Sequence, residues 1–136
     1  MAREVDAAAI AANVATIAER TDAIVCGVVK ADGYGHGAVL AARVMLDGGA
    51  AWLGVVDVAE ALALRAAGID APILAWLHAA EPDLGPAVAA GVDVGVSSLA
   101  QLEQAADVAA TIHLKVDTGL GRNGVPMGEW SAVVER

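Results

Sequence analysis

Two hydrophobic patterns alternate along most of the chain. Residues 6–20 place Ile10, Val14 and Ile17 at spacings of three and four, which predicts an amphipathic helix whose apolar side lies on a sheet. Residues 23–30, AIVCGVVK, form a nearly continuous apolar run, as expected for a parallel strand covered on both faces. The same alternation predicts strands at 23–30, 51–56, 73–77, 92–96 and 111–116.

Helices are predicted between these strands. They cover 38–46, 58–66, a segment that begins near Leu99 and one that begins near Met127. Residues 66–70 and 89–93 are nearly identical in sequence. In each, a glycine (Gly68 or Gly91) follows the end of a helix, at a position that needs left-handed backbone. Ser98 is the predicted cap of the helix that follows it. The pattern indicates a repeating βα unit, with a glycine-rich turn at 33–37 after the first strand.

Two folds accommodate about five strands that are each followed by a helix. One is an open doubly wound sheet, and the other is the first part of an eight-stranded α/β barrel. The last predicted helix reaches Arg136 without a stop signal, and a complete barrel has about 250 residues, so the barrel is favoured. The expected fold class is α/β, the N-terminal part (about five βα units) of a TIM-type (β/α)8 barrel. Residues 1–136 are expected to form one partial domain.

Composition narrows the class of protein. With 57% hydrophobic residues the chain has enough apolar surface for a core, and a net charge of −9 argues against a nucleic-acid partner. The N-terminus lacks a signal-peptide core, and no apolar run approaches the roughly 20 residues that span a membrane, so we expect a cytoplasmic protein without a membrane partner. Cys26 is alone and is expected to be a buried small hydrophobe. Few aromatics and many alanines favour closely packed helices.

Polar residues cluster where the predicted strands end, which is where barrel enzymes carry their catalytic groups. Lys30 ends the first strand, Asp57 follows the second, and Lys115 lies in the fifth, where strand alternation points it into the barrel. Burial lowers a lysine pKa, and a neutral amine forms a Schiff base with an aldehyde or a carbamate with carbon dioxide. The aldehyde cofactor pyridoxal phosphate fits this chemistry, because Tyr34 in the following turn offers a hydroxyl to its phosphate.

Simpler interpretations stay open for the same residues. Lys30 at a strand end also suits a side chain that only reaches solvent, and GYGHG alone is a weak phosphate-loop signal. Lys115 and Arg122 also suit an ordinary ion-pair network with Asp117.

The remaining polar residues are given structural roles. His36 is expected to form a hydrogen bond in its turn, His113 to pair with an internal carboxylate, and His78 to lie with Glu81 on a loop surface. No group of them has the ligands that a metal needs, so metal binding is not expected. Three further residues are expected on a solvated helix surface: Asp57, Glu60 and Arg65.

Two motifs are specific to one family. VVKADGYGHGA at 28–38 strongly resembles the pyridoxal-phosphate attachment motif of the alanine racemase family, and HLKVDTGLGRNGV at 113–125 resembles the second hallmark of that family. The stretches at 8–19 and 55–74 also fit, so the resemblance covers essentially the whole chain. Two departures, Leu120 and Asn123, stand where relatives commonly carry methionine and leucine.

The resemblance implies a pyridoxal-phosphate-dependent interconversion of L-alanine and D-alanine, which supplies D-alanine for peptidoglycan. It implies that Lys30 holds the cofactor through a Schiff base and then handles the α-proton on the D-alanine side. Tyr34 would lie at the cofactor phosphate. Arg122 would lie near the substrate carboxylate and the phenolic oxygen of the cofactor, with Lys115 as the carbamylated lysine that orients it.

The resemblance also implies what lies outside these residues. The opposite-face tyrosine, the arginine at the pyridine nitrogen, most phosphate ligands and the C-terminal β domain would follow Arg136. The chain alone is therefore expected neither to racemise alanine nor to hold its cofactor tightly, whereas the full-length protein is expected to be a homodimer. Alternatives are another barrel enzyme of this type, such as a serine racemase or a decarboxylase of basic amino acids, and a non-catalytic cofactor-binding remnant.

Overall fold

A single parallel sheet organises the chain. The computed structural model describes residues 4–79 and 82–136. Its strands are β1 (Cys26–Val28), β2 (Trp52–Val55), β3 (Ile73–Ala75), β4 (Asp93–Val96) and β5 (Ile112–Leu114). All neighbouring pairs are parallel, and the spatial order β1-β2-β3-β4-β5 follows the sequence without a reversal. A doubly wound sheet reverses its order at a switch point, so the sequential order confirms the barrel type of α/β fold.

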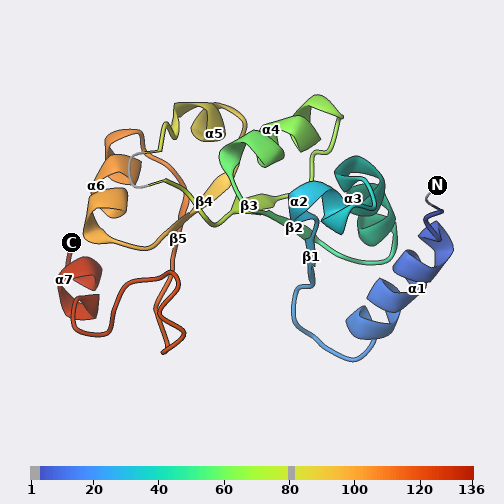
Figure 1. The fold of residues 1–136 in the computed structure, drawn as a ribbon, viewed down its shortest axis with the longest axis horizontal. Coiled ribbons are helices and arrows are strands. Elements are labelled where there is room, and N and C mark those ends of the chain that lie inside the picture. The colour runs from blue at the N-terminus through green and yellow to red at the C-terminus, as the bar shows by residue number, and fades with distance from the viewer. Residues whose placement is uncertain (1–3, 80–81) are drawn as a thin grey trace.

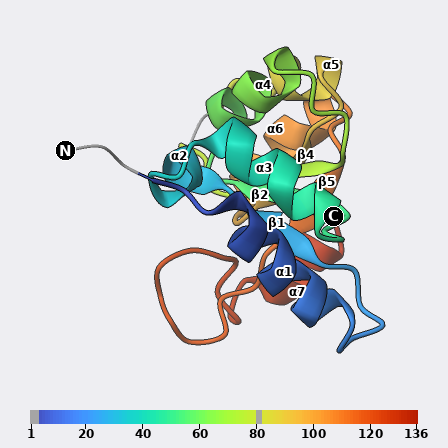
Figure 2. The ribbon, with the colours of Figure 1, turned by 90° about the vertical axis from the view of Figure 1, so that its right-hand side faces the viewer.

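Helices follow the strands on the outer side of the arched sheet (Figure 1). They are α1 (Ala7–Ala18), α2 (Lys30–Tyr34), α3 (Ala38–Asp47), α4 (Val58–Ala66), α5 (Gly85–Ala89), α6 (Leu99–Asp107) and α7 (Trp130–Val134). In both views the loop between β5 and α7 lies on the opposite side of the strands from α4 and α5 (Figure 2). The described residues include no helix that is long and apolar enough to cross a membrane.

The core lies between the outer face of the sheet and helices α3 to α6. Its largest members, Leu53, Leu64 and Ile73, are each at most 1% exposed, and alanines fill most of the helix side. The fully buried alanines include Ala42, Ala61, Ala75, Ala87 and Ala105. Small side chains let the helices approach the sheet closely, which confirms the prediction made from the alanine-rich composition.

Helices α4 and α6 follow the predicted signals, whereas α7 begins at Trp130 and not near Met127. Helix α4 has the predicted bounds, and Ser98 caps α6 by accepting a hydrogen bond from the Gln101 N–H. Helix α1, however, packs mainly on α3, and an added Cβ at Gly48 would lie only 3.1 Å from the Cβ of Val14. The prediction that the apolar side of α1 lies on the sheet was therefore wrong, and Ile17 is 56% exposed.

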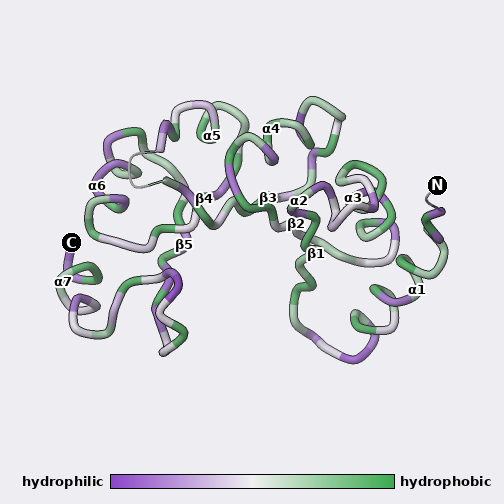
Figure 3. The backbone as a smooth tube through the Cα atoms, in the orientation of Figure 1, coloured by the Kyte–Doolittle hydropathy of each residue, from purple (hydrophilic) through white to green (hydrophobic). Residues whose placement is uncertain are grey.

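The inner, concave face of the sheet carries the residues that alternate with the core. The tube in Figure 3 is hydrophobic along β1 and becomes hydrophilic just after β5. Cys26 projects on this inner face, where its Sγ lies 3.4 Å from the position of an added Cβ at Gly54. Cys26 is exposed, so the prediction of a buried cysteine was wrong: one face of the apolar run lies in the core, and Cys26 lies on the other face, at the edge strand of the sheet.

Candidate active site

Lys30 stands at the start of a left-handed turn. Strand β1 ends at Val28, two residues earlier than predicted, and Lys30 opens α2. Residues 31–34 all have positive φ, at 53°, 54°, 60° and 54°, and only one of them, Gly33, is a glycine. Left-handed backbone costs about 1–2 kcal/mol for each residue with a Cβ, so this turn must be held by contacts elsewhere in the fold.

The turn presents an amine and a phenol on one side. Lys30 Nζ lies 5.8 Å from the ring centroid of Tyr34, a cation–π distance, and Tyr34 is 61% exposed. Within the described part of the chain, neither the amine of Lys30 nor the hydroxyl of Tyr34 has a hydrogen-bond partner. His36 is occupied inside the turn, where its Nδ1 lies 2.8 Å from the Gly33 carbonyl, as predicted.

Trp76, to which the sequence pattern assigned no role, covers the middle of the inner face. An added Cβ at Gly54 would lie 2.2 Å from its indole ring, and one at Gly95 would lie 2.8 Å from its Cα. Two glycines on the strands flanking β3 therefore make room for one large side chain. The signal was present in the sequence as a tryptophan directly after one strand and a glycine inside each neighbouring strand.

Lys115 points to the same inner face, as predicted. Its Nζ donates to the Trp76 carbonyl at 3.1 Å and to Asn123 Oδ1, which also accepts from Ser97 Oγ at 2.9 Å. Burial lowers the pKa of Lys115, and the positive charge of Arg122 lowers it further. Both causes favour the neutral amine, which is the form that reacts with an electrophile.

Arg122 and Asp117 do not form the ion-pair network that was one interpretation of this motif. Arg122 is exposed, and the ion pairs within the described residues join other groups. Asp117 Oδ1 instead accepts from the Gly119 N–H at 2.9 Å and the Gly121 N–H at 3.1 Å. The guanidinium of Arg122 is therefore available to an anionic ligand.

The Asp117 contacts predict a pH-dependent loop. Hydrogen bonds from the amides of Gly121 and then Gly119 lower the pKa of Asp117 below its usual range. A lowered pKa in the folded state means that these bonds are complete above the unfolded value of about 3.9 and are lost as the pH falls through the folded value. In glycine-labelled protein, the amide resonances of both glycines should titrate together below about pH 3.9. Asp117→Asn should abolish that titration, and a midpoint at or above the ordinary value would contradict the assignment.

Asp57 and Glu60 belong to this end of the sheet, not to a solvated helix surface. Asp57 Oδ1 caps α4 by accepting from the Glu60 N–H at 2.9 Å. The carboxylate of Glu60 accepts from two backbone N–H groups, of Val56 at 2.9 Å and Ala31 at 2.8 Å. The spacing D-x-x-E before an apolar run is a capping-box signal, which could have identified both residues.

His78 also differs from its predicted surface position. It is half-buried, and its Nε2 lies 2.9 Å from the Ala75 carbonyl. Burial lowers the pKa of His78, although the Ala75 carbonyl and the charge of Asp57 raise it in part. Its proposed neighbour Glu81 lies outside the described residues.

The opposite end of the sheet carries structural contacts. Arg65, predicted on a solvated surface, donates to four backbone carbonyls, which are those of Ile69, Ala71, Ala90 and Gly91. His113 pairs with Asp93 at 2.9 Å, as predicted, and contacts the edge of the Trp52 ring. Among the described residues, no three His, Cys, Asp or Glu side chains are grouped to hold a metal ion.

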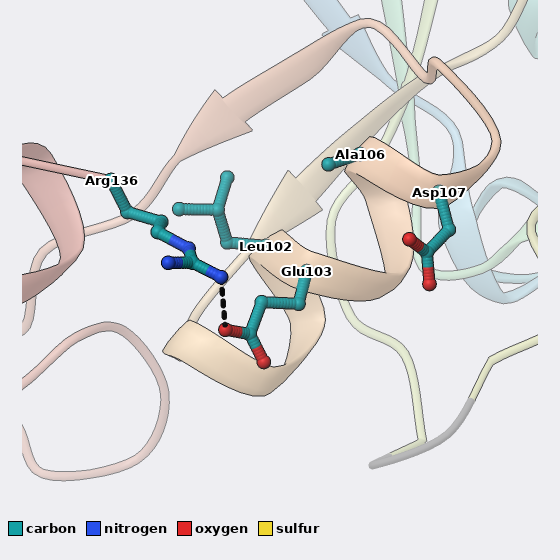
Figure 4. A pocket seen from close by; sticks show the side chains of 5 residues that line it. All are labelled: Leu102, Glu103, Ala106, Asp107 and Arg136. Atoms are coloured by element: carbon teal, nitrogen blue, oxygen red, sulfur yellow. Dashed lines mark ion pairs between the residues drawn. The ribbon is translucent and has the colours of Figure 1, made fainter.

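A surface pocket lies between α6 and the C-terminal residue, away from these groups (Figure 4). Its lining includes Leu102, Glu103 and Arg136, and an ion pair of 3.2 Å joins the last two. Its lining includes no lysine, serine, cysteine or aromatic side chain. The chemistry of the chain lies instead at the C-terminal ends of β1 and β5, the two edge strands, and no contact within the described residues joins Lys30 to Lys115.

The sequence of this chain was compared with those of known proteins and protein families. Residues 5–136 match the family described as "Alanine racemase, N-terminal domain". The chain is 55% identical over 135 residues to an alanine racemase of Thermobifida fusca, covering 94% of this chain and 36% of that protein. It is 53% identical to one of Mycobacterium ulcerans, with 97% and 36% covered. The chain thus spans about 36% of the length of these relatives.

Solved structures agree with the sequence relatives. The crystal structure of alanine racemase from D-cycloserine producing Streptomyces lavendulae superposes with a TM-score of 0.90 at 41% identity, covering 96% of this chain and 36% of that one. An alanine racemase from Corynebacterium glutamicum gives a TM-score of 0.90 at 34% identity, covering 96% of this chain and 39% of that one. Matching sequence and fold over nearly the whole chain show that it belongs to the family of alanine racemase N-terminal domains.

Proposed function

We propose that this chain is the cofactor-binding part of a pyridoxal-phosphate-dependent alanine racemase, whose full-length form interconverts L-alanine and D-alanine. The observation that carries the proposal is the left-handed turn after β1, which presents the Lys30 amine and the Tyr34 hydroxyl without protein hydrogen-bond partners among the described residues. Because the chain spans about 36% of its relatives, the activity is proposed for the full-length protein, as a homodimer, and residues 1–136 alone are proposed to be inactive.

The donor set fits pyridoxal phosphate. An amine with no hydrogen-bond partner suits the aldehyde of the cofactor, and a free phenolic hydroxyl four residues further on suits a phosphate oxygen. The indole of Trp76 adds an aromatic surface on the inner face, next to the end of the sheet where both groups lie. Lys30 would hold the cofactor covalently through Nζ, and Tyr34 would donate to its phosphate.

Lys30 then serves as the proton-transfer group. With its Nζ not bonded to the cofactor, Lys30 would take or return the α-proton on one face of the substrate. When bound, pyridoxal phosphate supplies the electron sink that spreads the negative charge left on that carbon. The turn would orient the amine for both steps, because its left-handed backbone sets the direction in which the Lys30 side chain leaves the main chain.

Lys115 and Arg122 supply the substrate end of the site. Arg122 would bind the substrate carboxylate, and its positive charge lowers the pKa of Lys115 further, which favours the neutral amine. A neutral Lys115 amine attacks carbon dioxide and loses a proton, which yields a carbamate anion on Nζ. That anion would accept hydrogen bonds from the guanidinium and orient it, so two neighbouring cations become an ion pair.

The proposal is tested by locating the cofactor. The protein used is the full gene product or, where the reading frame ends at Arg136, a chimaera that adds the matching remainder of the Thermobifida fusca relative; both are called the full-length racemase below. Reduction with borohydride in the presence of pyridoxal phosphate, followed by peptide mapping, should place the label on Lys30. Label on another lysine, or none, would overturn the assignment.

Lys115 gives a separate prediction. Lys115→Ala in the full-length racemase should lower kcat by roughly 10²-fold or more, because Arg122 loses the anion that orients it. Small carboxylates such as acetate should restore part of the activity by occupying the space of the carbamate. The control is the exposed Arg43→Ala, which should lose little activity and show no response to acetate. A Lys115→Ala variant with no acetate response would argue against the carbamate role.

A further inference from the structure

Among the hydrogen bonds of the described residues, one side chain from a later βα unit reaches the left-handed turn that carries Lys30. Asp32 Oδ1 accepts from the N–H of Ala38, the first residue of α3, at 2.8 Å, and within the turn His36 Nδ1 lies 2.8 Å from the Gly33 carbonyl. A more distant contact comes from Glu60 on α4, whose Oε1 accepts from the Ala31 N–H at 2.8 Å. That N–H belongs to the peptide bond directly after Lys30, so Glu60 fixes the first peptide of the turn.

The second carboxylate oxygen of Glu60 accepts a hydrogen bond from the loop between β2 and α4, the helix that carries Glu60. Oε2 accepts from the Val56 N–H at 2.9 Å, just after β2, while the Glu60 N–H donates to Asp57. Strands β1 and β2 are neighbours, so one carboxylate ties the ends of both strands together. Both partners are N–H donors, and only a carboxylate can accept from both with its two oxygens.

A similar side-chain link joins the ends of β3 and β4. There the linking residue is Gln101, a glutamine in place of a glutamate. Gln101 Oε1 accepts from the Ser97 N–H at 2.9 Å, and Gln101 Nε2 donates to the Ala79 carbonyl at 3.2 Å. Here one partner is a donor and the other an acceptor, which suits an amide. The match between residue type and partner at both junctions argues that the Glu60 contact to Ala31 is specific.

We propose that Glu60 is a positioning residue for Lys30, which holds the left-handed turn so that the amine faces the inner side of the sheet. The inference rests on the proposed role of Lys30 as the cofactor lysine. Glu60→Gln keeps the size of the side chain but turns an NH₂ group toward one of the two N–H donors. Gln101→Glu makes the converse mismatch, an anion against the Ala79 carbonyl, away from Lys30.

The test compares hydrogen exchange in the full-length racemase without cofactor. Glu60→Gln should speed exchange of peptides covering 29–38 on the order of tenfold, the effect of losing one charge-assisted hydrogen bond. Gln101→Glu should leave these peptides unchanged and affect those around 97–101. With cofactor, Glu60→Gln should also slow borohydride trapping on Lys30, whereas Gln101→Glu should not. Glu60→Ala, which removes both contacts, should exceed Glu60→Gln in both measurements.

The outcomes separate this inference from the proposed function. If wild-type label lies on Lys30 but neither Glu60 variant changes exchange at 29–38, the positioning role is wrong. If Gln101→Glu changes that segment and the trapping as strongly as Glu60→Gln, the role is general stability and the inference also fails. If wild-type label lies elsewhere, the proposed function fails, whatever exchange shows.

Discussion

Lys30→Ala in the full-length racemase is expected to abolish covalent retention of pyridoxal phosphate and to lower kcat by at least about 10³-fold. Alanine removes both the amine that bonds to the cofactor and the group that moves the α-proton, and a positioned acid or base alone contributes about 10²–10⁴-fold. The measurement pairs borohydride labelling with circular dichroism of alanine turnover.

Lys30→Arg is the matched control for charge. A guanidinium keeps the positive charge and the length of the side chain, but it stays protonated and is not a nucleophile. Both variants should therefore lose covalent cofactor to the same degree. Retention of trapped cofactor by Lys30→Arg, or turnover within tenfold of wild type by either variant, would show that the reactive amine lies elsewhere.

The alternation of helix and strand was predictable because each element has its own hydrophobic period and its own end signals. Gly68 and Gly91 have φ values of 78° and 59°, as their positions after helix ends predicted. Ser98 and Lys115 also behave as predicted, the first from capping chemistry and the second from strand alternation. These features depend on neighbours within a few residues, so local sequence carries enough information to specify them.

The turn at Lys30 could not be predicted from local preference. Ala31, Asp32 and Tyr34 each favour right-handed or extended backbone, and only Gly33 accepts the left-handed region freely. The conformation is maintained by partners such as Glu60, 29 residues away from Ala31 in sequence. Strand β1 therefore ended earlier than its apolar run indicated.

Arg65 illustrates the same limit at the other end of the sheet. Its sequence context is that of an exposed helix position, but its guanidinium reaches carbonyls 4, 6, 25 and 26 residues further along the chain. The partners are main-chain atoms, which no side-chain pattern marks. The stacking of successive βα units brings two of them, the carbonyls of Ala90 and Gly91, within reach.

Arg65→Ala is expected to destabilise this domain by about 2–4 kcal/mol, because four carbonyls at 2.7–3.0 Å lose a charged donor. The carbonyls of Ala90 and Gly91 lie at the C-terminal end of α5, where a cation is favourable, so that loss adds to the effect. The free energy is read from the urea dependence of hydrogen exchange in peptides covering β3 and β4 of the full-length racemase.

Arg43→Ala is the control, because the exposed Arg43 donates to one carbonyl among the described residues, that of Ala67, at 2.9 Å. Its removal should change the free energy of unfolding by no more than about 0.5 kcal/mol. Arg65→Lys should fall between the two variants, since an ammonium carries charge but cannot reproduce a planar fork of donors. Equal effects of Arg65→Ala and Arg43→Ala would mean that water replaces the guanidinium at no cost, and that the four carbonyl contacts do not hold successive βα units together.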